Sequence, residues 1–118
     1  MRIATEERRQ HKRYKLDNSV SISPQGIFQV IDISKGGFCF RCPPYTPLTD
    51  IFETDILSSG ASIQGFSAKR AWVKMTENST HEYLPTIVGV NFRTLTKEQE
   101  MLLLQLLHTL EQNSSSLH

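Results

Sequence analysis

The sequence predicts a mainly β protein, a small antiparallel six-stranded (split) β-barrel followed by a C-terminal α-helix. Short apolar runs with the two-residue period of strands, separated by turn residues, fill residues 18–92. No helical stretch that could connect parallel strands lies between these runs. The apolar period becomes helical only near the C-terminal end. A chain of 118 residues suits one domain with one core.

The first two predicted strands form a hairpin. Residues 18–23 carry the apolar positions Val20 and Ile22, and residues 27–33 carry a second apolar run. Residues 24–26, Pro-Gln-Gly, form the turn between them.

A short third strand is expected around Phe38 and Phe40, which share one face. The proline-rich stretch 42–47 follows it. Prolines cannot donate to a strand ladder, so this stretch is predicted to be a connection.

Cys39 and Cys42 form a C-x-x-C pattern at this third strand. Residues three apart in a strand point to opposite faces, too far apart to form a disulfide. The sequence has no second C-x-x-C, and its four histidines are scattered. We therefore expect structural cysteines and no metal site.

Residues 51–57 and 63–75 are predicted to pair about the turn at residues 58–60, and the second strand is long enough to bend around a barrel corner. Trp72 is expected in the core or at the barrel rim. The turn at 77–80 leads to a last strand with clean alternation. Its inward face is predicted to carry Leu84, Thr86, Val88, Val90 and Phe92.

A C-terminal helix over residues 96–112 is predicted to pack on the barrel. Thr96 and Gln99 have the spacing of a capping box at its start. Leucines repeat at three and four residues along it, at positions 102, 103, 106, 107 and 110. Residues 113–118 are expected to form a disordered tail.

Charge is distributed unevenly along the chain. The net charge is +1, yet residues 1–15 carry six basic and two acidic side chains, so the remainder is mildly acidic. We therefore expect residues 1–15 to form a basic flexible arm, residues 16–95 to form the barrel, and an anionic partner to meet the arm.

Several classes of protein are disfavoured. No apolar run approaches the length of a membrane span, and the N-terminal residues lack the features of a secretion signal, so a soluble cytoplasmic protein without membrane insertion is expected. No nucleophile elbow, phosphate loop, H-E-x-x-H or dinucleotide fingerprint is present. We therefore predict neither catalysis nor a cofactor.

The arm contains an arginine motif, Arg9-x-x-x-Arg13, preceded by Arg8. A guanidinium pairs bidentately with phosphate oxygens or with guanine O6 and N7, and it stacks on purines. The arm therefore suits a guanine-containing phosphate ligand.

A second motif, Asp32-x-Ser34-x-x-Gly37, lies where a strand ends and turns. Asp32 offers acceptors for guanine N1 and N2, Ser34 offers a hydroxyl, and Gly36 and Gly37 let a flat ligand approach the backbone. Taken alone, the motif would suit an Asx-type turn with positive φ at Gly37. This chemistry leaves a dinucleotide, a mononucleotide and a nucleic acid open.

Together the two motifs resemble the signature of the PilZ family. The resemblance extends to Ala71-Trp72-Val73, to residues 88–92 and to the leucine-rich helix, and it covers about residues 8–110. It implies a receptor for cyclic di-GMP, a ligand that is not a catalytic cofactor. The implied ligand-binding residues are Arg8, Arg9, Arg13, Asp32, Ser34, Gly36 and Gly37.

The resemblance further implies that the arm becomes ordered on the ligand and that the domain signals to an unidentified downstream protein. Two alternatives remain: a protein-interaction adaptor of the same fold without nucleotide binding, and a nucleic-acid module using the arm. Nucleic acid is disfavoured because basic residues do not continue as a stripe onto the strands. A homodimer is left open.

Overall fold

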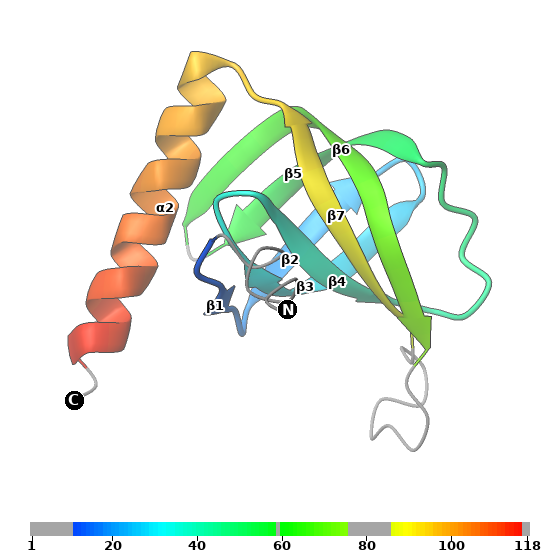
Figure 1. The fold of residues 1–118 in the computed structure, drawn as a ribbon, viewed down its shortest axis with the longest axis horizontal. Coiled ribbons are helices and arrows are strands. Elements are labelled where there is room, and N and C mark those ends of the chain that lie inside the picture. The colour runs from blue at the N-terminus through cyan, green and yellow to red at the C-terminus, as the bar shows by residue number, and fades with distance from the viewer. Residues whose placement is uncertain (1–10, 59, 76–85, 117–118) are drawn as a thin grey trace, which may run out of the picture.

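The computed structural model describes residues 11–58, 60–75 and 86–116. In these residues strands precede a single helix (Figure 1). The elements are β1 (Tyr14–Lys15), β2 (Ser19–Ser23), β3 (Gly26–Ile33), β4 (Gly37–Cys42), β5 (Ile51–Ser58), β6 (Ala61–Met75), β7 (Thr86–Thr94) and α2 (Lys97–Ser116).

The strands form a closed antiparallel barrel. The order β3-β2-β5-β6-β7-β4 is closed by pairing of β4 with β3, which confirms the predicted six-stranded barrel. β1 is an additional strand, and it pairs with the end of β3, Tyr14 opposite Ile33. Residues 14–15 were predicted to belong to a flexible arm; that prediction is wrong for them, because they continue the edge of β3 beyond its pairing with β2.

The barrel interior is filled by alternating apolar side chains with an aromatic cluster. Phe28 stacks on Phe40 with centroids 5.0 Å apart, and Phe38 meets the edge of Phe66 at 6.0 Å. The inward face predicted for the last strand is confirmed: Thr86, Val88 and Val90 are buried, and Phe92 packs on the core. The remaining residues of that prediction, Leu84 and the turn at 77–80, lie outside the described residues.

β2 presents its serines to the interior. Ser19 and Ser21 are buried, while Val20 and Ile22 lie half-buried on the outer side. The hydroxyl of Ser19 donates to that of Ser58 on β5 at 2.7 Å, so each of these two buried hydroxyls has a hydrogen-bond partner.

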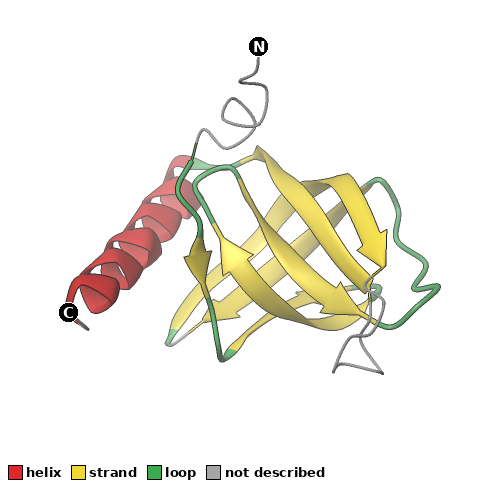
Figure 2. Ribbon diagram, turned by 60° about the horizontal axis from the view of Figure 1, so that its bottom comes forward, coloured by secondary structure: helices red, strands yellow, loops and turns green. Residues whose placement is uncertain are grey.

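Helix α2 packs against β6 and β1 and lies beside the barrel (Figure 2). Leu103 and Leu106 enter the core. The capping box is confirmed: the Thr96 N–H donates to Gln99 Oε1 at 2.9 Å, and the Gln99 N–H donates to Thr96 Oγ1 at 3.1 Å. The helix continues to Ser116, so the predicted boundary at residue 112 and the tail predicted from residue 113 are wrong by four residues.

Within the described ranges, no helix combines the length and apolar character needed to cross a membrane.

Candidate functional site

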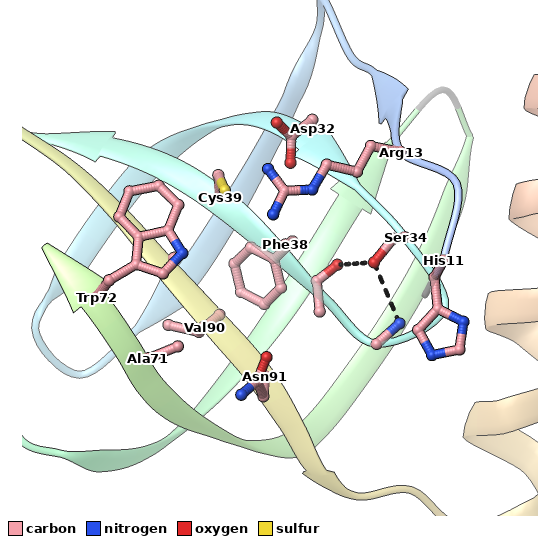
Figure 3. A pocket seen from close by; sticks show the side chains of 13 residues that line it. His11, Arg13, Asp32, Ser34, Phe38, Cys39, Ala71, Trp72, Val90 and Asn91 are labelled. Atoms are coloured by element: carbon pink, nitrogen blue, oxygen red, sulfur yellow. Dashed lines mark hydrogen bonds between the residues drawn. The ribbon is translucent and has the colours of Figure 1, made fainter. Parts of the chain in front are cut away.

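A recess lies on the outer wall of the barrel, beside the segment that enters β1 (Figure 3). Its walls come from that segment, from the turn between β3 and β4, and from the outer faces of β4, β7 and β6. The lining residues are His11, Arg13, Asp32, Ser34, Gly36, Gly37, Phe38, Cys39, Ala71, Trp72, Gly89, Val90 and Asn91. Its volume of about 90 Å³ is far below the roughly 300–1,000 Å³ of pockets that enclose a small ligand. It can therefore hold one flat group, with the rest of a larger ligand outside.

The turn between β3 and β4 is held by its own hydrogen bonds. The Ser34 N–H donates to the Gly37 carbonyl at 2.8 Å. The Ser34 hydroxyl accepts from the Gly36 N–H at 3.1 Å and donates to the Gly37 carbonyl at 3.4 Å (Figure 3). Ser34 thus fixes the backbone on which the recess is built. Neither Gly36 nor Gly37 has positive φ, so the Asx-type turn with positive φ at Gly37 is not formed.

The two glycines of this turn have different neighbours where a side chain would lie. A Cβ on Gly37 would lie 1.9 Å from the Val90 carbonyl oxygen, because β4 and β7 approach closely there. A Cβ on Gly36 would lie 3.0 Å from Cδ2 of His11, a side chain that can move. Gly37 is therefore fixed by strand packing and Gly36 by the segment that lies across it.

Arg13, in the segment before β1, and Asp32, on β3, both face the recess. Tyr14 pairs with Ile33 and Lys15 with Asp32, so the residue that precedes β1 lies beside the end of β3. Figure 3 shows the Arg13 guanidinium directed toward the Asp32 carboxylate above the recess. This places a guanidinium and a carboxylate, the two groups expected to recognise guanine, on one rim.

Cys39 forms the floor below them. It is opposite Asp32 in the pairing of β3 with β4 and is 5% exposed. Burial, and then the nearby Asp32 carboxylate, raise the pKa of the Cys39 thiol to about 12. Cys39 is therefore a neutral thiol at physiological pH.

Trp72 closes the opposite side of the recess. Of its two predicted positions, the core is wrong: its indole lies on the outer wall, 39% exposed, and lines the recess. A bulge between Arg70 and Trp72 adds one residue and turns Trp72 outward. The indole rests on Gly89, where a Cβ would lie 2.2 Å from its Cε2.

The structure brings five of the predicted site residues together. Arg13, Asp32, Ser34, Gly36 and Gly37 all line the same recess. Arg8 and Arg9 lie outside the described residues.

Sequence reasoning missed other residues of the recess, chiefly His11, Cys39, Trp72, Gly89 and Asn91. One signal was present, because a glycine inside a strand often marks a close approach by another group, here the indole on Gly89.

The two cysteines have different surroundings. Both are free, as their spacing in a strand predicts, and both are buried. Cys42 belongs to the core, whereas Cys39 faces the recess. In the part of the chain that the structure describes, no group of three or more His, Cys, Asp or Glu side chains could hold a metal ion.

The fold and the recess define a class: a small closed β-barrel whose outer wall carries an arginine-flanked site at the entry of the chain. The family model described as PilZ domain matches residues 7–109, and the chain belongs to this family.

Two solved structures share the fold. The PilZ domain with c-di-GMP of YcgR from Escherichia coli has a TM-score of 0.70 and 14% identity, over 92% of this chain and 95% of that one. YcgR in complex with c-di-GMP, also from Escherichia coli, has a TM-score of 0.71 and 14% identity, over 92% of this chain and 48% of that one. A search of the curated proteins finds no match.

Proposed function

We propose that this chain is a receptor domain for cyclic di-GMP. One observation carries the proposal: Arg13 and the Asp32–Gly37 turn, which the hairpin of β2 and β3 separates in sequence, line the same recess. The family supports it, as do two neighbours of the same fold whose structures contain c-di-GMP.

The recess suggests a role for each side chain. Asp32 accepts hydrogen bonds from a guanine edge, and Trp72 offers its indole face for stacking. Arg13, with Arg9 and Arg8 of the same arm, binds phosphate or the guanine O6 and N7 edge. Ser34 maintains the turn, Gly37 allows the close approach of β4 to β7 under the recess, and Gly36 leaves room for His11 of the arm.

Ligand binding is proposed to order the arm and so to change the surface that the domain presents to a downstream protein. The six basic side chains in residues 1–15 support this, since they would be attracted to the phosphates. The proposed location is the cytoplasm. The adaptor role without nucleotide is the alternative function, and the binding experiment below tests it first. A homodimer is compatible with either role.

A receptor role suits the chemistry of the recess better than catalysis does. Cys39 lines it, but burial and Asp32 keep this thiol protonated, with a pKa of about 12. The Ser34 hydroxyl is bonded to the turn.

Isothermal titration with cyclic di-GMP, beside GTP and cyclic di-AMP, tests the proposal. Saturable, guanine-specific binding is expected, with loss in Arg13→Ala and in Asp32→Ala. Lys97→Ala, which removes an exposed charge at the start of α2, is the matched control and should bind as the wild type does. Absence of binding by the wild type would leave an adaptor of the PilZ fold.

A further inference from the structure

The register of the strand pairs identifies the residues that lie next to the recess on the outer wall of the barrel. Outward-facing residues of adjacent strands form cross-strand rows. The row of the recess contains Asp32, Cys39, Gly89 and Trp72, from β3, β4, β7 and β6 respectively. The next row contains Gln29, Arg41, Ile87 and Lys74 from the same four strands. On β4, β7 and β6 the rows are two residues apart, about 7 Å, and on β3 a bulge adds one residue between them.

This second row carries two cationic side chains. Arg41 on β4 and Lys74 on β6 both pair with Ile87 of β7 between them. Neighbouring strands lie about 4.8 Å apart, so the backbones of β4 and β6 are roughly 10 Å apart. Both side chains are long enough to reach a group that lies between them. Arg41 is half-buried and Lys74 is exposed.

The recess is too small to hold a base together with its phosphate. With about 90 Å³ it holds one flat group, so the phosphate of a nucleotide whose base occupies it lies outside. Toward the Gly36 end, His11 of the arm stands against the turn. The opposite direction, past Cys39 and Trp72, leads to Arg41 and Lys74, at a distance that one sugar can bridge.

We propose that Arg41 and Lys74 form a phosphate-binding subsite for the ligand whose guanine occupies the recess. This inference rests on the proposed function and adds two residues outside both sequence motifs. The subsite takes a phosphodiester group, and its contribution is electrostatic and sensitive to salt.

Titration calorimetry of the full chain with cyclic di-GMP at several salt concentrations tests the subsite. Lys74→Met and Arg41→Met keep an apolar stem and remove the charge. Each should weaken binding roughly fivefold at low salt, the size of an exposed ion pair, and reduce the salt dependence. Lys74→Arg keeps the positive charge and should bind with the affinity of the wild type. Lys97→Met, which removes a charge at the start of α2, is the matched control. The melting temperature of each unliganded variant shows whether it is folded. If Arg41→Met does not fold, the affinity and salt dependence of Lys74→Met alone test the subsite.

The outcomes separate the two proposals. If Arg13→Ala abolishes binding while Lys74→Met binds with wild-type affinity and salt dependence, the subsite is overturned and the receptor remains. If Lys74→Arg and Lys74→Met weaken binding equally, the residue acts through packing, and the subsite is again overturned. If the wild type does not bind, the proposed function is overturned, and the subsite with it.

Discussion

Lys12 and Glu111, 99 residues apart in sequence, form an ion pair with an Nζ to Oε2 distance of 2.8 Å. The Lys12 ammonium also lies 5.2 Å from the centroid of the Tyr14 ring. Hydrogen bonds from Lys12 and then from Tyr14 lower the pKa of Glu111. The residues on either side of Arg13 are therefore held by the same carboxylate of α2.

Glu111→Gln should loosen the segment that carries Arg13. The ion pair is exposed, so its loss should change global stability little. Backbone amides of residues 12–15 should exchange hydrogen faster, while those of β3 to β7 keep wild-type protection. Glu98→Gln in the first turn of α2 removes a carboxylate away from the arm and serves as the control. Unchanged exchange at residues 12–15 would contradict the prediction.

The same contact should respond to pH in two windows. The pKa of Glu111 is lowered below its ordinary 4.5, so its contribution is present above that value and is lost as pH falls through the lowered pKa. The pKa of Lys12 is raised above its ordinary 10.5 by the hydrogen bond to Glu111, so its contribution is lost as pH rises through the raised pKa. NMR titration of the Glu111 carboxyl should show the lowered value, and Lys12→Met should bring it back toward 4.5. An equal pKa in both proteins would refute this.

Gly37→Ala should destabilise the barrel much more than Gly36→Ala. The first Cβ would meet the Val90 carbonyl at 1.9 Å, so β4 and β7 must separate. Overpacking of this kind costs about 1–3 kcal/mol, a fall in melting temperature on the order of 4–12 °C. The second Cβ would meet the movable His11 ring. Calorimetric melting of both variants checks this, and equal melting temperatures would show that the strand approach is not the constraint.

Trp72 should report on the recess by fluorescence. It is the single tryptophan of the chain, and its partly exposed indole lies on Gly89. Binding of cyclic di-GMP should change its emission because a base would cover the indole. Gly89→Ala should displace the indole from the wall, alter the emission of the free protein and weaken binding, with little loss of stability. Retention of wild-type emission and affinity by Gly89→Ala would show that the indole does not depend on this contact.

Local pattern predicted most of the barrel and the start of the helix. Clean alternation identified the inner face of β7, and the spacing of Thr96 and Gln99 identified the helix cap. β1 was missed because Tyr14–Lys15 is too short to show a period, and its pairing with β3 is a long-range contact.

Tertiary context decided which way several side chains point. On β2, the hydroxyl of Ser58 gives Ser19 a buried partner, so serines point inward although Val20 and Ile22 are the apolar residues of this strand. On β6, an added residue in the ladder turned Trp72 outward. Such a bulge leaves no periodic signal in the sequence. The motif residues of the recess could therefore be predicted, whereas the position of Trp72 in its wall could not.

The pairing of β3 with β4 joins the ends of the sheet into a ring. A ring of strands bonded on both sides resists opening at any one place, and the recess is built mainly on its outer surface. The segment entering β1 and helix α2 are joined to the ring and to each other at Glu111. In the proposed receptor, the wall that would bind the ligand and the helix that holds the arm are separate parts of the molecule, so changes in α2 should alter the response to the ligand while the binding surface keeps its chemistry.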